Sequence, residues 1–456
     1  MILCEEMSMI IYTRIIRKSN NSLFFCVYVN LIILFIDIIM KKLEIIGGNK
    51  LFGTIRNQTS KNATLPILAA SILSSGIVEI EDVPNISDVD NMIKILRSLG
   101  VVVKKRGRTV RIDSTHASSN AIDKTLAKTM RSSLFLLGPM LAKFKHMDLC
   151  EPGGCRIGKR NIDVHLTSFR RLGVSIKQRG EYISFDATKA KAKRVKLRMP
   201  SVGATENIIM FSCMLKGKTV ILNPAKEPEI VDLSNFLNKM GAKILGAGTN
   251  KITIYGVDNL DSTIYTPMGD RIVAGTLMSA VALTGGDVTI TNAMPYQNEK
   301  FIKILCSLGC QIDIKNDIIH ISRSTGLVSN ITISTDFYPG LPTDLQSMIV
   351  SLATVSKGET RIKEKIFEDR FLTVDELKKM GAEITKIDCR TVVINGVECL
   401  NGAKLKAKDL RGGASLVLAG LVANGITTVS GLNYIERGYE DLAGMLSRLG
   451  ANIRRI

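Results

Sequence analysis

One unit of about 70 residues recurs six times along the chain, and this repeat constrains the fold more than any other feature. In each copy, an amphipathic helix pattern runs into Leu-Gly or Met-Gly and a short apolar strand pattern follows. Glycine adopts the left-handed conformation at little cost, so it is typical of the residue that ends a helix. The sequence therefore predicts helix ends at Gly100, Gly173, Gly241, Gly309, Gly381 and Gly450.

A second helix pattern precedes each of these and is apolar on almost every side, which is typical of a buried helix. The six segments are KNATLPILAASILSSG, KTMRSSLFLLGPMLAKF, SVGATENIIMFSCMLKG, DRIVAGTLMSAVALTGG, LPTDLQSMIVSLATVSKG and LRGGASLVLAGLVANG. A chain of 456 residues is too long for one core. Six α+β units therefore predict two domains of three units, with the helices inside and the sheets outside.

The domain boundary is expected near residues 266–270. We expect residues 61–269 to form an N-terminal domain. Residues 40–60 and 270–456 should form a C-terminal domain, which the strand pattern near residues 42–53 closes.

The first 39 residues do not fit the repeat. Their apolar run at residues 23–39 is shorter than the ~20 residues that span a bilayer, and it contains Asn30 and Asp37. No small-residue cleavage site follows the run, and a strand pattern starts afresh at Met40. Residues 1–39 are therefore expected to be a misassigned start or a non-native extension. A membrane anchor and an additional buried helix are the alternatives.

The formal charge of +19 favours an anionic partner, although solvated surface lysines explain much of it equally well. Nucleic-acid binding is disfavoured, because the basic residues are scattered and aromatic residues make up only 5% of the chain. The nine cysteines form no CxxC pair and there are only four histidines, so no metal site is expected. An odd number of cysteines in a long chain indicates reduced thiols and a cytoplasmic protein.

The starts of the buried helices are unusually rich in cations. Helix N-termini carry unpaired N–H groups and the positive end of the helix dipole. If the six helices converge on an interdomain cleft, that cleft is suited to binding anions. The residues at the starts are Lys61, Asn62, Arg131, Ser132, Ser201, Asp270, Arg271, Thr343, Asp344 and Arg411.

The loop CEPGGCRIGKRNIDVH carries a candidate reactive thiol. Cys155 follows two glycines and lies close in sequence to Arg156 and Arg160, which should lower its thiol pKa. A lone cysteine is often only a small core residue, but the glycine-rich cationic setting favours a functional role here.

Other charged residues could have either a structural or a functional role. Asp344 follows Pro342 at a helix start, where a simple capping carboxylate is as good an explanation as catalysis. Arg370, Arg411 and Arg437 could be surface charges. Their positions at corresponding loops or helix starts of the last two units favour a functional role.

Ten motifs, in order from about Met40 to the C-terminus, resemble those of the UDP-N-acetylglucosamine 1-carboxyvinyltransferase family. They are SKNATLP, KTMRSS, PGGCRIGKRNIDVH, PSVGATEN, KEPEIVD, GDRI, LPTDLQ, FEDRF, DLRGGASLVLAG and ERGYE. The resemblance implies an inside-out α/β barrel fold. It also implies transfer of an enolpyruvyl group from phosphoenolpyruvate to the 3′-hydroxyl of UDP-N-acetylglucosamine, without a cofactor, at the first committed step of peptidoglycan synthesis.

The resemblance also implies roles for individual residues. Cys155 would be the general acid that protonates the phosphoenolpyruvate methylene, and Asp344 would accept the proton of the sugar hydroxyl. Cations would hold the carboxylate and phosphates beside Asn62: Lys61, Arg131, Arg160, Arg370, Arg411 and Arg437. The sugar nucleotide would be positioned by Asp163, Ser201, Val202, Gly203 and the backbone near Ile366.

Three alternatives remain open. Enolpyruvylshikimate phosphate synthase has the same fold and reaction type, but it lacks a cysteine-bearing PGGC loop. An RNA-processing cyclase built on such a barrel would need a histidine nucleophile, for which His165 is the best placed of the four. A catalytically idle paralogue would use the same cationic cleft only to bind anions. No stable nucleic-acid or membrane partner is expected.

Overall fold

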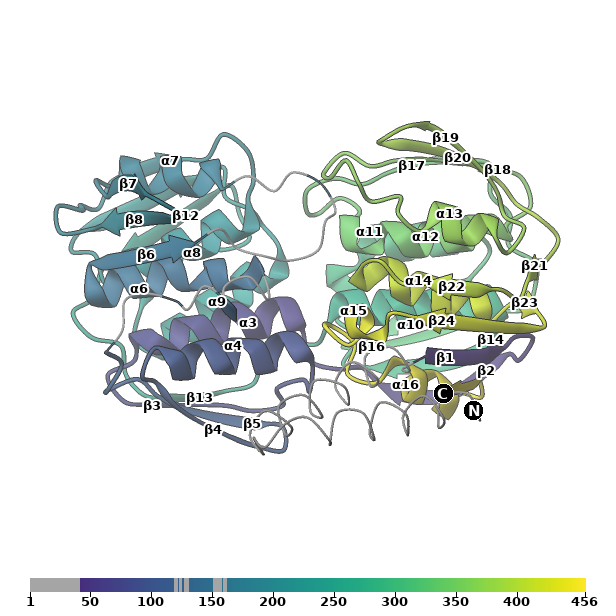
Figure 1. The fold of residues 1–456 in the computed structure, drawn as a ribbon, viewed down its shortest axis with the longest axis horizontal. Coiled ribbons are helices and arrows are strands. Elements are labelled where there is room, and N and C mark those ends of the chain that lie inside the picture. Colours follow the sequence, from purple (N-terminus) through teal and green to yellow (C-terminus); the bar gives the residue numbers. More distant parts are fainter. Residues whose placement is uncertain (1–41, 119–121, 123–124, 127–130, 151–157, 159–161) are drawn as a thin grey trace, which may run out of the picture.

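The computed structural model describes residues 42–118, 122, 125–126, 131–150, 158 and 162–456. These residues form two lobes that lie side by side, each with helices inside and sheets on the outer surface (Figure 1). Each lobe has its own hydrophobic core. One core runs from Leu65 to Leu260. The other combines residues 43–55 with residues 272–453.

Three sheets surround the first core. Their strand orders are β13 (Thr263–Tyr265), β3 (Ile77–Ile80), β5 (Thr109–Asp113), β4 (Val102–Arg106); β6 (His146–Cys150), β8 (Tyr182–Asp186), β7 (Ser175–Arg179); and β11 (Lys243–Leu245), β12 (Lys251–Tyr255), β10 (Lys218–Leu222), β9 (Arg194–Lys196).

Three four-stranded sheets surround the second core. Their strand orders are β22 (Lys404–Lys406), β24 (Ile426–Ser430), β1 (Lys42–Ile46), β25 (Asn452–Arg455); β15 (Gln311–Lys315), β16 (Ile318–Arg323), β14 (Gly286–Thr291), β2 (Leu51–Arg56); and β17 (Ile331–Ser334), β18 (Glu359–Lys363), β20 (Thr391–Asn395), β19 (Glu383–Asp388). A two-stranded ribbon joins β21 (Leu400–Asn401) and β23 (Ala423–Asn424).

The strand directions repeat from sheet to sheet. In each of the five four-stranded sheets, one edge strand is parallel to its neighbour and the remaining pairs are antiparallel. The parallel pairs are β13 with β3, β9 with β10, β2 with β14, β17 with β18 and β22 with β24. The repeated topology confirms the repeat that the sequence predicts.

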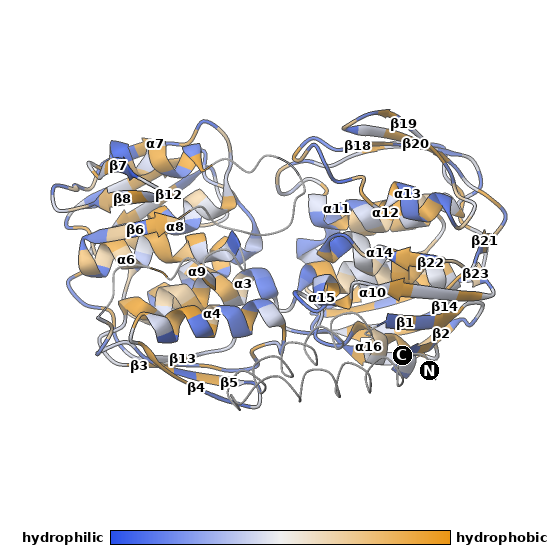
Figure 2. Cartoon of the chain, viewed as in Figure 1, coloured by the Kyte–Doolittle hydropathy of each residue, from blue (hydrophilic) through white to orange (hydrophobic). Residues whose placement is uncertain are grey.

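The six apolar segments form the central helices. They are α3 (Lys61–Ala70), the 3₁₀ turn η2 (Arg131–Leu136) with α6 (Leu137–Phe144), α8 (Val202–Ser212), α10 (Arg271–Thr284), α12 (Gln346–Thr354) and α14 (Leu410–Gly420). Figure 2 shows apolar residues concentrated on these inner helices. The fold is the predicted α/β architecture with buried helices and outer sheets.

The second of these segments differs from a continuous α-helix, because it begins as the 3₁₀ turn η2. Pro139 has no N–H to donate to the carbonyl four residues earlier, so the α-helical ladder is interrupted there. Gly138 also packs so closely that a Cβ atom would lie 2.3 Å from the carbonyl oxygen of Asn207.

A second set of helices lies closer to the surface: α4 (Ser87–Ser98), α7 (Asp163–Arg171), α9 (Pro228–Lys239), α11 (Glu299–Ser307), α13 (Val374–Lys378) and α16 (Leu442–Arg448). The predicted glycines follow them, and all six have a positive φ, from 83° at Gly100 to 108° at Gly309. Shorter elements are η1 (Ser71–Leu73), η3 (Pro295–Gln297), η4 (Thr343–Leu345) and α15 (Leu432–Ile435). Within the described residues, no helix combines the length and apolar character that crossing a membrane requires.

Two segments connect the lobes and are hydrogen-bonded to each other. Thr59 pairs with Gly269 in an antiparallel bridge, and the Asp270 amide donates to the carbonyl of Gln58 at 2.9 Å. This crossing brings the start of α3 next to the start of α10.

Candidate active site

Carboxylate caps join the helix starts at the crossing. Asp270 caps α10, and one of its carboxylate oxygens accepts a hydrogen bond from the Lys61 amide at 3.1 Å. Asp409 caps α14 by accepting from the amides of Arg411 and Gly412. Short polar side chains at these positions satisfy helix N–H groups that lack intrahelical partners. The caps therefore place Lys61 and Arg411 beside the crossing between the lobes.

Asp344, in η4, lies between two buried arginines. Nη2 of Arg370 is 2.5 Å from Oδ1 of Asp344, and Nη2 of Arg411 is 3.2 Å from Oδ2. Burial alone would raise the pKa of Asp344, but the charges of Arg411, Arg370 and Lys61 hold it well below its usual range. Asp344 is thus more than a helix cap: it is the shared anion of an arginine pair.

Arg411 has unused hydrogen-bonding capacity. Its side chain is almost fully buried, and its guanidinium lies 5.3 Å from the ring centre of Tyr439. Nε and Nη1 of Arg411 are buried without a hydrogen-bond partner among the described residues. A buried unpaired donor is costly, so an anion that bound to these atoms would relieve that cost.

Asp88, in α4, joins two other predicted cations. Nζ of Lys61 lies 2.9 Å from Oδ2 of Asp88, and Nε of Arg437 lies 2.9 Å from Oδ1. Burial would raise the pKa of Asp88, but Lys61 and Arg437 outweigh it and lower the pKa. Arg437 belongs to the other lobe and pairs with Asp88 of α4. The sequence alone allowed Arg411 and Arg437 to be surface charges, but both form ion pairs within the cluster.

The segment that contains Ile366 is held by a buried carboxylate. Oε1 of Glu364 accepts from the amides of Ile366 and Phe367, at 2.7 and 3.1 Å. Arg370 lies four residues further along the same segment and is buried. This loop and η4 therefore bring Ile366, Arg370 and Asp344 to one side of the lobe.

The predicted sugar-nucleotide residues lie at the starts of α7 and α8. Ser201 caps α8 by accepting from the Ala204 amide at 3.4 Å, and Val202 and Gly203 form the first turn. Asp163 opens α7 and forms an ion pair with Arg198. Asn62 lies beside Lys61 in the first turn of α3.

His165 contacts this group. A Cβ atom on Gly203 would lie 3.1 Å from Nε2 of His165, so the two residues pack together. Burial, together with the charge of Arg131, lowers the pKa of His165 to about 4. His165 is therefore neutral at physiological pH, and Arg131 lies close enough to His165 for its charge to act on the imidazole.

Cys155 and Arg160 lie outside the described residues. Gly158, between them in sequence, is described and has φ +124°. A Cβ atom on Gly158 would lie 2.8 Å from a carboxylate oxygen of Glu368, in the FEDRF segment. Gly158 thus approaches the loop of Ile366 and Arg370 from the other lobe.

Sequence reasoning missed three carboxylates of the site: Asp88, Glu364 and Asp409. Asp88 and Asp409 look like ordinary helix-start residues, and Glu364 follows a strand in a lysine-rich stretch. Their local setting carries no functional signal, although Asp409 falls within the DLRGGAS motif. Among the described residues, no three His, Cys, Asp or Glu side chains are placed to hold a metal ion.

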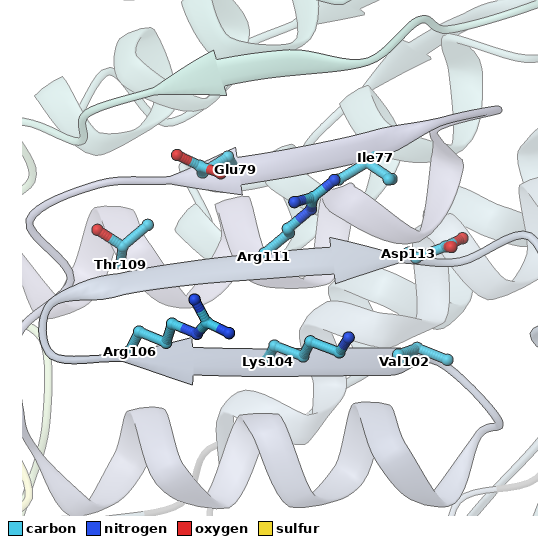
Figure 3. Close-up of a pocket in the computed structure, with 8 residues that line it drawn as sticks. All are labelled: Ile77, Glu79, Val102, Lys104, Arg106, Thr109, Arg111 and Asp113. Carbon is cyan, nitrogen blue, oxygen red and sulfur yellow. The ribbon is translucent and has the colours of Figure 1, made fainter.

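A hollow of about 540 Å³ lies elsewhere, on the sheet of β3, β4 and β5 (Figure 3). Its lining includes Lys104, Arg106 and Arg111 together with Glu79 and Asp113. None of the predicted site residues lines it. The hollow is therefore separate from the cluster around Asp344.

Comparison with known proteins places the chain in a family. The family model described as EPSP synthase (3-phosphoshikimate 1-carboxyvinyltransferase) matches residues 45–446. Among solved structures, the enolpyruvyl transferase NikO from Streptomyces tendae has a TM-score of 0.82 at 24% identity, covering 91% of this chain and 99% of its own. EPSP synthase from Acinetobacter baumannii has a TM-score of 0.72 at 21% identity, covering 91% and 100%. These structures confirm the fold.

Sequence relatives are more similar. The chain is 46% identical to UDP-N-acetylglucosamine 1-carboxyvinyltransferase 2 of Caldanaerobacter subterraneus subsp. tengcongensis, over 91% of this chain and all of the relative. It is 42% identical to UDP-N-acetylglucosamine 1-carboxyvinyltransferase of Geobacter metallireducens over the same shares. The chain therefore belongs to the enolpyruvyl transferase family and, within it, to the UDP-N-acetylglucosamine 1-carboxyvinyltransferases.

Proposed function

We propose that this protein transfers the enolpyruvyl group of phosphoenolpyruvate to the 3′-hydroxyl of UDP-N-acetylglucosamine and releases phosphate. The observation that carries the proposal is the largely buried cluster of Lys61, Arg370, Arg411 and Arg437 around two carboxylates, with donor atoms of Arg411 left unpaired. Phosphoenolpyruvate carries a carboxylate and a phosphate, which need fixed cations. The names of the sequence relatives support UDP-N-acetylglucosamine as the acceptor.

The cations divide between the two lobes. Lys61 and Arg131 belong to the first lobe, and Arg370, Arg411 and Arg437 to the second. Arg160 completes the proposed set but lies outside the described residues. A dianion bound between the lobes satisfies cations on both sides and so favours closure, which excludes water and aligns the reactants.

The proposed reaction begins with proton transfer from Cys155 to C3 of phosphoenolpyruvate, which leaves C2 electron-poor. The 3′-hydroxyl oxygen of the sugar then bonds to C2, and its proton passes to Asp344. The product is a tetrahedral ketal. In the second stage, C3 returns a proton to the Cys155 thiolate, the C3–H electrons form the new C2–C3 double bond, and phosphate leaves with the electrons of the C2–O bond. The cations stabilise its charge.

The sugar nucleotide is proposed to lie along the starts of α7 and α8. The amides of the capping residue Ser201 and of the first-turn residues Val202 and Gly203 suit a diphosphate, since a helix N-terminus favours negative charge. Asp163 and the backbone of Ile366 would position the uridine and the sugar, with Asn62 near the reacting hydroxyl. These assignments follow the motif positions and are part of the proposal.

Three wider assignments belong to the same proposal. Residues 61–269 and residues 40–60 with 270–456 are proposed as the two domains, consistent with the separate cores. The enzyme is proposed to act in the cytoplasm, where thiols such as those of Cys213, Cys306 and Cys310 stay reduced. The reaction would be the first committed step of peptidoglycan synthesis, which supports cell shape and division.

Phosphate release tests the function. Protein that starts at Met40 is incubated with phosphoenolpyruvate and UDP-N-acetylglucosamine, and shikimate 3-phosphate replaces the sugar nucleotide in a parallel reaction. Release with the sugar nucleotide alone is expected. Release only with shikimate 3-phosphate would favour the sister reaction that the family model's description names. If neither acceptor gives phosphate release, with the Met40 protein or with the full chain, the protein would be an anion-binding paralogue without catalytic activity.

A further inference from the structure

Glu364 is a buried carboxylate that the proposed chemistry does not use. It directly follows β18 and is 1% exposed. Its Oε1 accepts from the amides of Ile366 and Phe367, and its Oε2 accepts from the Thr343 hydroxyl at 3.0 Å. Within the described part of the chain, no cation forms an ion pair with this side chain. Burying a carboxylate costs free energy, which its three hydrogen bonds offset only in part. The burial of Glu364 at this position therefore calls for an explanation.

Thr343 carries the effect of Glu364 to the arginine cluster. The Thr343 hydroxyl oxygen accepts from Nε of Arg370 at 3.1 Å. Nη2 of the same guanidinium donates to the carboxylate of Asp344, the next residue along the chain. A line of hydrogen bonds therefore runs from Glu364 through Thr343 and Arg370 to the proposed base.

The direction of hydrogen-bond donation along this series depends on a carboxylate at position 364. A carboxylate only accepts hydrogen bonds, so Thr343 must direct its single hydroxyl proton toward Glu364. The Thr343 lone pairs then face Arg370 and accept from Nε. An amide at position 364 could instead donate to Thr343, which would leave the hydroxyl proton directed at Arg370.

The two oxygens serve different parts of the site. Oε1 holds the backbone of Ile366, on the side proposed for the sugar nucleotide. Oε2 holds Thr343, and through it Arg370 and Asp344, on the side proposed for phosphoenolpyruvate and the base. We propose that Glu364 is a positioning residue that sets these two sides of the active site independently, one with each oxygen. This inference rests on the proposed function.

A capping carboxylate with only a structural role would behave differently. Its loss would lower stability, lower kcat and raise both KM values together, because the loop as a whole would loosen. The proposed role instead predicts that breaking the Oε2 link alone separates kcat from the KM for UDP-N-acetylglucosamine. That separation is the readout that a structural role does not produce.

The experiment uses the full chain with the substitutions T343V, T343S and E364Q. T343V removes the hydroxyl and keeps the side-chain shape, so we expect kcat to fall about 10- to 100-fold, as for loss of a hydrogen bond to a charged group. The KM for phosphoenolpyruvate should rise, and the KM for UDP-N-acetylglucosamine should stay within about twofold. T343S keeps the hydroxyl and should stay within about threefold of wild type in every constant.

E364Q tests the polarity. Its carbonyl oxygen can still accept from the two amides, so the KM for UDP-N-acetylglucosamine should again change little while kcat falls as in T343V. Glu359 lies at the other, exposed end of β18, and E359Q is the matched control that should leave all constants unchanged. Melting temperatures of all variants show whether each is folded.

The outcomes separate this inference from the proposed function. Wild-type protein without turnover would overturn the function itself. Wild-type turnover with T343V and E364Q at wild-type kcat would overturn only the positioning role. A fall in kcat together with comparable rises in both KM values, alongside lowered melting temperatures, would also overturn it, because that pattern indicates a structural role.

Discussion

Nη2 of Arg370 lies 2.5 Å from Oδ1 of Asp344, so the proposed base is paired with a cation in the ligand-free protein. Arg411 holds the other carboxylate oxygen. In the proposed mechanism, Asp344 therefore competes with the substrate anion for the two arginines. If phosphoenolpyruvate binds these two arginines as proposed, their charge is shared with the substrate, and the pKa of Asp344 should rise toward that of a useful base. The proposed function thus predicts that anion binding and the base strength of Asp344 are coupled.

The first prediction concerns Asp344→Asn. The substitution leaves two buried arginines without their shared anion, and breaking a buried ion pair costs about 3–5 kcal/mol. Chemical denaturation at pH 7 should show that loss. Phosphate-release activity should fall at least ~100-fold, because general-base catalysis contributes about that much. Inorganic phosphate can replace the missing anion, so it should raise the melting temperature of D344N more than that of wild type. An active D344N of wild-type stability would contradict the assignment.

The second prediction concerns the pH dependence of Asp88. Burial alone would raise the pKa of Asp88, but the charges of Lys61 and Arg437 lower it by more than burial raises it. The folded pKa is therefore below the ordinary value of ~3.9. An acid with a depressed folded pKa stabilises the protein above its unfolded pKa, and that contribution is lost as pH falls through the folded pKa. The stability gap between wild type and D88N should therefore be constant from pH 7 to pH 5 and shrink below about pH 4.

A matched control for D88N lies on the same helix. Asp90 pairs with Lys105 at 2.8 Å, but its side chain is 52% exposed. Exposed pairs contribute about 0–1 kcal/mol. D90N should therefore change stability little at any pH. Equal effects of D88N and D90N would mean that burial of the Asp88 cluster is not what gives it strength.

Much of the fold was predictable because its signals are local. Each of the six glycines ends a helix through its own backbone conformation, and the neighbouring apolar spacing reports which face is buried. The 3₁₀ start of the second inner helix was missed because it depends on Pro139 and on the tight contact between Gly138 and Asn207. That contact joins residues far apart in sequence, which no local pattern records.

The site was predictable only in part for the same reason. Motifs and repeat position pointed to Lys61, Asp344 and Arg437. Their partners could not be read from the chain: Arg437 and Asp88 are 349 residues apart, and Asp88 resembles a common first-turn carboxylate. Pairings across two lobes arise from the tertiary fold, so sequence reasoning found the cations without the anions that hold them.

The third prediction concerns Cys155 and the epoxide antibiotic fosfomycin, which mimics phosphoenolpyruvate. Its alkylation of Cys155 should abolish phosphate release. Peptide mass spectrometry should locate the adduct at Cys155 and not at the exposed Cys306, Cys389 or Cys399, which serve as internal controls. Unchanged activity after prolonged exposure would count against this role.

Two substitutions test whether Cys155 acts as an acid. C155D retains an ionisable proton donor, so it should keep measurable turnover and lose fosfomycin sensitivity. C155S should be nearly inactive, because a hydroxyl is a far weaker acid than a thiol. Turnover of C155S comparable to wild type would show that proton transfer to C3 comes from another group.

The fourth prediction concerns Glu206, a fully buried side chain in α8 whose two carboxylate oxygens have no hydrogen-bond partner among the described residues. Burial, with the nearby charges of Glu229 and Glu227, raises its pKa well above the ordinary value. An acid that stays protonated when folded but ionises when unfolded makes stability fall as pH rises above its unfolded pKa of ~4.3, by up to about 1.4 kcal/mol per pH unit.

E206Q removes that titration and keeps the shape, so its stability relative to wild type should increase as pH rises above about 5, until the pH reaches the raised folded pKa of Glu206. Denaturation midpoints across this range provide the measurement. Glu229 is the contrasting case, because it forms a two-point ion pair with buried Arg271 at 3.0 and 3.3 Å. E229Q should destabilise the protein by about 3–5 kcal/mol, since it leaves that arginine unpaired. If E206Q instead loses stability as pH rises, Glu206 is ionised in the folded protein and a cation must lie close to it.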